Sequence, residues 1–317
     1  MTGVMRVVVT GAAGFLGSRL CESLLAGALG RASAIVAIDT SACRIADPRV
    51  ESHIGTIADA DFAAAAVDAG VDTVFHLAAV LSGQSEAEFD VGMRVNVDGT
   101  RHLLEACRRL PRPCRFVFTS TVAAYGGPLP EVVPEDAPVR PETSYGSAKV
   151  IAEVLLTEYS RRGFVDGIAC RLPTVAVRPG APNSALSSFV SGIIREPLAG
   201  IESVCPVPPD TPLWICSPDV LTRNLLHAAR LPTSELNGRR TVNLPGISVT
   251  PADMLDSLER CAGPAARALV RCEPVPDVMR IVCGWPGAFD VSRALQLGFA
   301  ADTDVDSIVR QFIARPR

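Results

Sequence analysis

Tyr145 and Lys149 stand four residues apart in the stretch from Thr143 to Glu153. On a helix this spacing places both side chains on one face, about one turn apart, so a phenol lies beside an ammonium group. A neighbouring positive charge lowers the pKa of a tyrosine, and the phenolate that it favours can take a proton from a substrate hydroxyl. The same spacing also occurs on solvated helix faces, so the elements around the pair must supply the context.

Two hydroxyl residues, Ser120 and Thr121, follow the apolar run from Arg115 to Thr119. A hydroxyl close to the phenol can hydrogen-bond the substrate oxygen that gains or loses a proton. The run is typical of a buried strand, and ligands of open parallel sheets bind at the carboxyl ends of the strands. We therefore expect these hydroxyls at the ligand-binding edge.

Three glycines, Gly11, Gly14 and Gly17, lie between the β-branched run 4–10 and a helical pattern over 15–25. The order predicts a strand, a tight turn and a helix. Glycines permit the turn, the close approach of backbone to a pyrophosphate and close packing of helix on strand, and the helix N-terminus adds amides and a positive dipole. We interpret the segment as a dinucleotide-binding turn, although its glycine spacing departs from Gly-x-Gly-x-x-Gly.

Asp39 ends the next predicted strand, 34–38, and lies 22 residues beyond Gly17. A carboxylate at this position accepts hydrogen bonds from the adenosine ribose hydroxyls and repels a 2′-phosphate, which favours NAD over NADP. The alternative is that Asp39 caps a turn or a helix.

Further strands over 73–79, 115–120 and 167–172 alternate with helical segments, so we predict the α/β class with a Rossmann-type doubly wound parallel sheet. Prolines become frequent after Pro173, which suits a smaller C-terminal substrate lobe. We expect residues 1–172 to form the NAD-binding Rossmann domain, with 213–235 returning to it. Residues 173–317 would form mainly the substrate-binding lobe.

The composition narrows the function further. A net charge of −4 and a pI near 5.7 leave no basic footprint for nucleic acid or for an anionic membrane surface. The ten cysteines include no Cys-x-x-Cys pair, so we expect no metal site. No apolar run approaches the roughly 20 residues of a membrane span, and no signal peptide is apparent, so the expected location is the cytoplasm.

The order of these motifs resembles the extended short-chain dehydrogenase/reductase superfamily, which holds nucleotide-sugar epimerases and dehydratases. The resemblance implies NAD as the cofactor, Thr121 as the catalytic hydroxyl, Tyr145 as the acid/base, and Lys149 as the group that lowers the tyrosine pKa and holds the nicotinamide ribose. It also implies cofactor contacts along the glycine turn and the strand ends, at Gly11, Gly14, Phe15, Leu16, Gly17, Asp39, Ile57, Leu77, Ala78, Ala79, Asn96, Ser120, Tyr145, Lys149, Pro173 and Val175.

Two positions depart from the superfamily pattern. Gly55-Thr56-Ile57 lacks the acid that commonly holds adenine, with Asp59 two residues further on, and this leaves the adenine contact open. The run from Thr211 to Asp219 lacks the arginine with which nucleotide-sugar members grip the substrate diphosphate. A diphosphate substrate would lose its expected clamp there.

The segment 171–183, with 187–189 and 195–198 after it, resembles the branch of this superfamily that oxidises the C2 hydroxyl of D-erythronate, a four-carbon sugar acid, with NAD. The resemblance implies oxidation of a small sugar acid to its 2-keto acid. Candidate substrate contacts are Ser82, Thr121, Tyr145, Arg178, Asn183 and Ser188, with Arg178 as the first candidate for a carboxylate anchor. Arg178 could equally be a structural arginine that satisfies loop carbonyls.

Two other functions stay open at this point. One is an NAD-dependent nucleotide-sugar epimerase or dehydratase, and the other is a catalytically silent protein that responds to NAD(H). The intact trio of Thr121, Tyr145 and Lys149 argues against the silent protein, since a sensor needs no base. The superfamily also implies a homodimer that pairs the helices beginning near Ala87 and Ser144.

Overall fold

The computed structural model describes residues 4–30, 33–181 and 185–314, and the chain divides into two compact units. The first unit comprises residues 1–121, 143–171 and 222–242. The second comprises 122–142, 172–221 and 243–317. Each unit therefore takes several separate stretches of the chain.

The first unit alternates strands with helices. Its elements are β1 (Met5–Thr10), α1 (Phe15–Leu25), β2 (Ser33–Asp39), β3 (Val50–Ile54), α2 (Ala60–Ala66), β4 (Val71–His76), α3 (Ser82–Ala87), α4 (Phe89–Met93), a π-helical turn (Arg94–Asp98), α5 (Gly99–Arg108), β5 (Arg115–Thr121), α6 (Ser144–Arg161), β6 (Asp166–Leu172), α8 (Pro218–Arg230, which begins in the second unit), a 3-10 turn (Thr233–Leu236) and β10 (Thr241–Asn243). The helix predicted over 15–25 is confirmed to the residue.

The central sheet has seven strands in the order β10-β6-β5-β4-β1-β2-β3. The pairs β2–β3, β1–β2, β1–β4 and β4–β5 are all parallel. Apart from β10, this is the order of a Rossmann sheet, so the predicted fold class is confirmed. The direction of the connections reverses between β1 and β4, which makes their carboxyl ends the expected place for a ligand.

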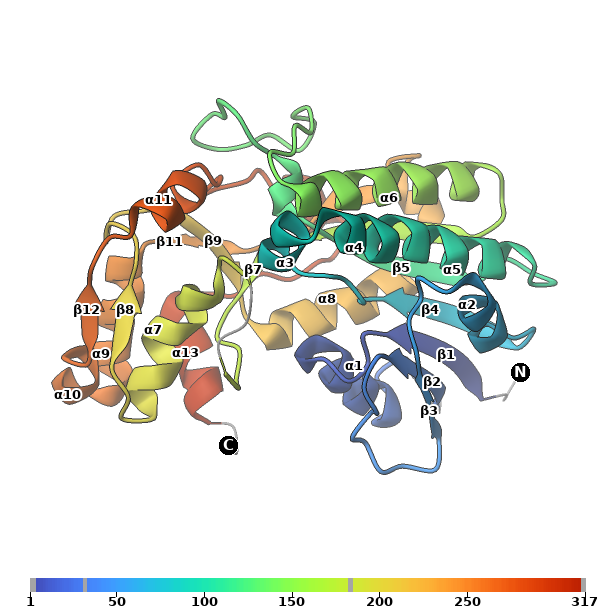
Figure 1. The fold of residues 1–317 in the computed structure, drawn as a ribbon, viewed down its shortest axis with the longest axis horizontal. Coiled ribbons are helices and arrows are strands. Elements are labelled where there is room, and N and C mark those ends of the chain that lie inside the picture. The colour runs from blue at the N-terminus through green and yellow to red at the C-terminus, as the bar shows by residue number, and fades with distance from the viewer. Residues whose placement is uncertain (1–3, 31–32, 182–184, 315–317) are drawn as a thin grey trace. The chain divides into compact units, whose positions relative to one another are not determined.

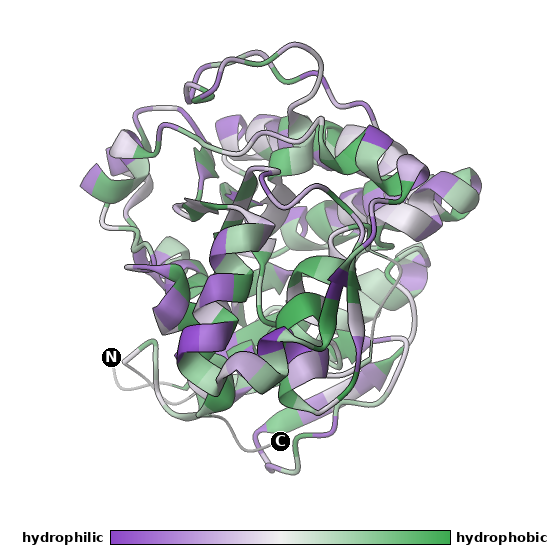
Figure 2. Cartoon of the chain, turned by 90° about the vertical axis from the view of Figure 1, so that its left-hand side faces the viewer, coloured by the Kyte–Doolittle hydropathy of each residue, from purple (hydrophilic) through white to green (hydrophobic). Residues whose placement is uncertain are grey.

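Helices cover both faces of this sheet. Figure 1 shows α4, α5 and α6 along one side of the strands and α1 with α8 along the other. The helices carry hydrophobic and hydrophilic residues side by side (Figure 2), and α1 buries Leu20, Cys21 and Leu24. Such helices gain stability mainly by packing their apolar face on the sheet.

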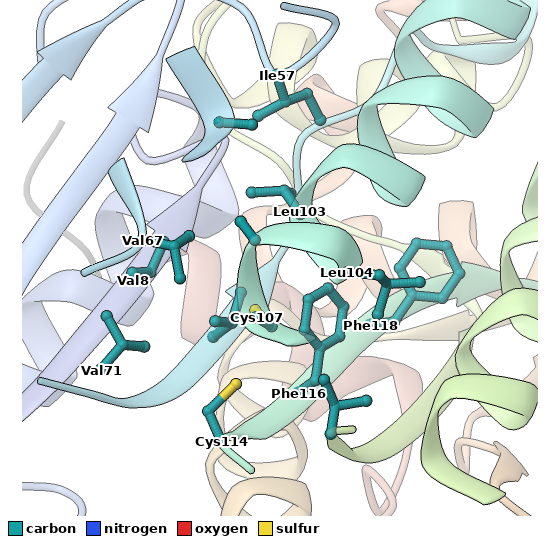
Figure 3. Close-up of a cluster of buried hydrophobic side chains, with 14 of the residues drawn as sticks. Val8, Ile57, Val67, Val71, Leu103, Leu104, Cys107, Cys114, Phe116 and Phe118 are labelled. Carbon is teal, nitrogen blue, oxygen red and sulfur yellow. The ribbon is translucent and has the colours of Figure 1, made fainter. Parts of the chain in front are cut away.

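The core of the first unit lies between the strands and α5. Phe116 and Phe118 of β5 are fully buried and pack with Leu103, Leu104 and Cys107 of α5 (Figure 3). Burying a side chain of this size stabilises the fold by roughly 1.5–3 kcal/mol. The core thereby fixes the end of β5, on which Ser120 and Thr121 lie.

The second unit is built from short elements. They are a 3-10 turn (Val122–Ala124), β7 (Thr174–Val175), α7 (Ser188–Leu198), β8 (Ser203–Cys205), β9 (Leu213–Cys216), β11 (Ile247–Val249), α9 (Pro251–Ala262), α10 (Pro264–Arg267), β12 (Val270–Cys272), α11 (Pro276–Val282), α12 (Ser292–Gln296) and α13 (Val305–Ile313). The strands form one three-stranded sheet, β11-β9-β7, and one pair, β12-β8. Among the helices of the described residues, none is long and apolar enough to cross a membrane.

Candidate active site

The glycine turn leaves no room for side chains. Gly11 has a φ of +71°, and a Cβ on it would lie 2.9 Å from the backbone nitrogen of Ala78. A Cβ on Gly17 would lie 2.0 Å from the carbonyl oxygen of Gly11. Gly14 caps α1 without a side-chain hydrogen bond, so the positive end of this 11-residue helix has no side-chain acceptor. The cradle therefore suits the pyrophosphate of a dinucleotide.

The carboxyl end of β4 is held against this turn by Thr10. Its Oγ1 accepts hydrogen bonds from the backbone nitrogens of Leu77, at 3.2 Å, and Ala78, at 3.1 Å. The Leu77 nitrogen also donates to the Thr10 carbonyl, which is the last bond between β1 and β4. β4 ends at His76, so the predicted extension of this strand to Ala79 is wrong. Leu77, Ala78 and Ala79 are half-buried at the β1–β4 crevice.

His76 is buried and neutral, and its hydrogen bonds determine which ring nitrogen carries the proton. Thr10 Oγ1 already accepts from two amides, so it donates to His76 Nδ1 at 2.7 Å. His76 Nε2 then donates to Thr100 Oγ1 at 2.9 Å, and Thr100 donates to the Asn96 carbonyl. Burial, assisted by the charge of Lys149, lowers the pKa of His76 well below its usual value. The imidazole thus ties β1 to α5.

The side chains of Asn96 and Ile57 make their contacts within the protein. Asn96 Oδ1 accepts from the Val80 nitrogen at 2.8 Å, while its Nδ2 donates to the Val80 carbonyl and to Ser85 Oγ. Its side chain therefore positions the segment after β4. The Ile57 side chain belongs to the core, where a Cβ on Gly99 would meet it at 2.8 Å. A cofactor contact by Ile57 would have to use its backbone.

Asp39 holds the glycine turn from the end of β2. Its Oδ2 accepts from the Ala13 nitrogen at 3.0 Å and its Oδ1 from the Ser41 nitrogen at 3.2 Å. The capping role left open above is thus present, and the half-buried carboxylate retains further lone pairs for a ligand. Asp59, in contrast, caps α2 through the nitrogens of Asp61 and Phe62.

Helix α6 presents Tyr145 and Lys149 on one side. Thr143 caps it by accepting from the Gly146 nitrogen at 3.0 Å. Lys149 is 2% exposed, and its Nζ donates to the Thr119 carbonyl at 2.8 Å. That nitrogen lies 5.7 Å from the centre of the Tyr145 ring. Lys149 is the only lysine in the sequence.

Burial, rather than the neighbouring charge, dominates the ionisation of the pair. Burial raises the pKa of Tyr145 to about 12, although the residue keeps some exposed surface, and it lowers the pKa of Lys149 to about 7. The expectation that Lys149 brings the pKa of Tyr145 towards neutrality is therefore wrong for the protein alone. Removal of both groups from water outweighs their attraction in the charged form.

Sequence reasoning missed a buried ion pair beside these residues. Glu153 accepts from Ser120 Oγ at 2.5 Å and from Arg171 at 2.9 and 2.6 Å. The signal was present, because Tyr145, Lys149 and Glu153 follow each other at intervals of four and share one face of α6. Its partner on β6 could not be read from spacing. Thr121, half-buried, ends β5 next to Ser120.

Ser82, the candidate substrate contact in the first unit, is half-buried and begins α3. Pro173 and Val175 belong to the second unit. Pro173 is buried there, and Val175 pairs with Cys216 on β9. Asn183 lies outside the described residues. The structure therefore brings together the glycine turn, the strand ends and the Tyr145–Lys149 helix within one unit.

Arg178 and Ser188 lie in the second unit. The Arg178 backbone is fixed from both sides, since its nitrogen donates to Ser191 Oγ at 3.0 Å and its carbonyl accepts from Arg195 Nη1 at 2.9 Å. Burial, and then the charge of Arg195, lowers the pKa of Arg178. Ser188 begins α7, and its nitrogen donates to the Ala185 carbonyl.

All ten cysteines are free thiols, and most of them are buried. Across residues 4–30, 33–181 and 185–314, no three His, Cys, Asp or Glu side chains are grouped as metal ligands.

Comparison with known proteins places these features in context. The profile of the NAD dependent epimerase/dehydratase family matches residues 7–209. A D-erythronate dehydrogenase of Cupriavidus necator is 49% identical over 98% of both chains, and one of Haemophilus influenzae is 40% identical over 98% of this chain and 99% of the relative. The crystal structure of a nucleoside-diphosphate-sugar epimerase from Agrobacterium tumefaciens has a TM-score of 0.94 and 39% identity, covering 98% of this chain and 94% of that one.

Proposed function

The chain belongs to the NAD-dependent epimerase/dehydratase family and is an NAD-dependent dehydrogenase of the extended short-chain dehydrogenase/reductase type, and we propose that it oxidises a small sugar acid. The substrate class is D-erythronate or a close analogue, and the product is the 2-keto acid formed at C2. The observation that carries the proposal is the buried Tyr145–Lys149 pair beside a dinucleotide cradle, in a chain similar over its length to D-erythronate dehydrogenases.

The cradle fits NAD. Gly11, Gly14 and Gly17 admit the pyrophosphate at the N-terminus of α1, and Leu77 to Ala79 line the neighbouring strand end. The Asp39 carboxylate supports NAD over NADP, because it repels a 2′-phosphate. When bound there, NAD would supply the hydride acceptor for C2 of the substrate, and the positive charge of its oxidised ring would favour loss of the Tyr145 proton.

Tyr145 is the proposed base. Its phenolate takes the proton of the C2 hydroxyl, and Thr121 hydrogen-bonds the same oxygen while it becomes a carbonyl. The pKa of Lys149, about 7, leaves this amine partly charged at neutral pH, so it can favour the phenolate in the working complex. The raised pKa of Tyr145 in the protein alone means that the base forms mainly once substrate and cofactor are in place.

Arg178 is the proposed anchor for the substrate carboxylate. The hydrogen bonds that fix this residue to Ser191 and Arg195 use its backbone, which leaves the guanidinium plane for a ligand. The lowered pKa of Arg178 reflects burial and then the charge of Arg195, and a substrate anion would stabilise the guanidinium of Arg178. Ser82, Asn183 and Ser188 are the proposed polar contacts.

A nucleotide-sugar substrate is the alternative, favoured by the name of the Agrobacterium protein. The run from Thr211 to Asp219 argues against it, because it contains no arginine or lysine, and Thr211 is buried with its hydroxyl against Cys283. The position thus offers no cation for a diphosphate.

The test mixes the purified protein with NAD and a panel of four- to six-carbon sugar acids and follows NADH absorbance. We expect D-erythronate or a near analogue to give NADH, and Tyr145→Phe to lose at least a hundredfold in kcat while binding NAD normally. Conversion of a nucleotide sugar without net NADH, and no reaction with any acid, would favour the alternative instead.

A further inference from the structure

Glu153 is a buried carboxylate that the proposed reaction does not use. Its side chain is 5% exposed, and the Arg171 side chain that binds it through two hydrogen bonds is 10% exposed. Ser120 Oγ donates to the same carboxylate. These two partners, on β5 and β6, fix its position on α6. The carboxylate therefore stands, with little water around it, one helical turn from Lys149.

Few charges act on the Lys149 ammonium. On α6 its neighbours are Tyr145 and Glu153, β4 contributes neutral His76, and β6 contributes Arg171, which lies on the far end of the Glu153 ion pair. From β5 come only the Thr119 carbonyl and the ring of Phe118, 4.6 Å from Nζ. Among these groups, Glu153 is the one anion.

We propose that Glu153 is a positioning residue that keeps the proton on Lys149, held in place for this task by Arg171 and Ser120. Burial lowers the pKa of Lys149, and Glu153 raises it again. Without the carboxylate, Lys149 would be largely uncharged at neutral pH, and Tyr145 would lose the cation that helps form its phenolate. The inference rests on the proposed role of Tyr145 as base, but the state of Lys149 can be measured without any substrate.

A purely structural role is the competing explanation, in which the ion pair only joins α6 to β6. Two variants distinguish these explanations. Glu153→Gln and Arg171→Gln break the same ion pair, but only Glu153→Gln removes the anion beside Lys149. The double variant Glu153→Gln/Arg171→Gln leaves neither member of the Glu153–Arg171 ion pair as an unpaired buried charge, so it tests the proposal even where a single variant does not fold. Glu158→Gln is the matched control, since Glu158 forms an exposed ion pair with Arg161 on the same helix.

The measurement is an NMR titration of protein labelled with [13Cε]lysine. Because the chain has one lysine, the spectrum holds one resonance and needs no assignment. The parent protein should titrate near pH 7. We expect Glu153→Gln and the double variant to lower the pKa of Lys149 by about one unit or more. Arg171→Gln should leave it unchanged or higher, and Glu158→Gln should leave it unchanged.

The proposal is overturned if the double variant titrates at the parental pH, or if Arg171→Gln lowers the pKa of Lys149 as far as Glu153→Gln does. With the substrate that the panel identifies, the alkaline limb of the kcat/KM profile should shift to lower pH in the same variants. The titration of Lys149 needs no substrate, so it gives a result even if no sugar acid in the panel is oxidised. Failure of the proposed function and failure of the proposed role of Glu153 can therefore be told apart.

Discussion

Lys149 and Tyr145 show how strongly burial governs single residues at this site. Both groups are driven towards their neutral forms, the amine by a lowered and the phenol by a raised pKa. Neighbouring groups then determine how much of each side chain is charged. Lys149 is also the one lysine beside 29 arginines, and arginines stay charged under any burial seen in proteins. Of the lysine and arginine side chains, only Lys149 can therefore lose its proton near neutral pH.

Replacement of Lys149 should change how stability depends on pH. The pKa of Lys149 is about 7 in the folded protein against an ordinary 10.5, so between these values the unfolded chain binds the proton and the folded chain does not. Stability of the parent therefore rises with pH in this window. Relative to Lys149→Met, its free energy of unfolding should gain about 1.4 kcal/mol per pH unit from pH 7.5 to 8.5. Urea unfolding of both proteins at pH 7.5 and 8.5 measures this difference. The same change in unfolding free energy with pH in the parent and in Lys149→Met would contradict the assigned pKa.

At the scale of elements, the glycine turn joins β1 to α1 and meets the end of β4. We expect Gly17→Ala to cost about 1–3 kcal/mol of stability and most of the NAD affinity, since its methyl would overlap the Gly11 carbonyl. Calorimetric NAD titration and thermal unfolding measure both effects. Gly284→Ala is the control, because its nearest neighbour would be 3.5 Å away. Equal stability and equal NAD affinity of the two variants would contradict the proposal that the glycine turn binds the pyrophosphate.

Asp39 connects the same turn to cofactor choice. Asp39→Asn keeps an oxygen that can accept from the Ala13 nitrogen but removes the charge, whereas Asp39→Ala removes both. We expect Asp39→Asn to narrow the preference for NAD over NADP by about tenfold with the turn intact, and Asp39→Ala to weaken both cofactors. Dissociation constants for the two cofactors decide this, and an unchanged ratio in Asp39→Asn would leave Asp39 with the capping role alone.

The helices and strands could be predicted from local sequence patterns, whereas contacts between residues far apart in the sequence could not. Helix 15–25 and the doubly wound parallel sheet follow from periodicity and from the glycine turn. The end of β4 depends on Thr10, which is 66 residues from His76. Arg171 reaches Glu153 across 18 residues and between two elements. No spacing rule encodes such partners, so the ion pair behind Lys149 stayed hidden.

At the scale of the whole molecule, α4 and α6 leave an apolar surface uncovered. Phe89 on α4 is 58% exposed, and Ile151 and Val154 on α6 are 40% and 65% exposed. A homodimer through these neighbouring helices would bury that surface, as we propose. Val154→Asp should then give a monomer in light scattering, while Ile54→Asp, on β3 and equally exposed, should not. A monomeric parent protein would contradict this proposal.

Hydride transfer from C2 is the central claim for the molecule, and D-erythronate carrying deuterium at C2 tests it most directly. Turnover with NAD should place the deuterium on the nicotinamide, give NADH and 2-keto acid in equal amounts, and slow the reaction when hydride transfer limits the rate. Tyr145→Phe should abolish the transfer. Deuterium retained in the carbon product, or NADH that carries none, would contradict oxidation at C2.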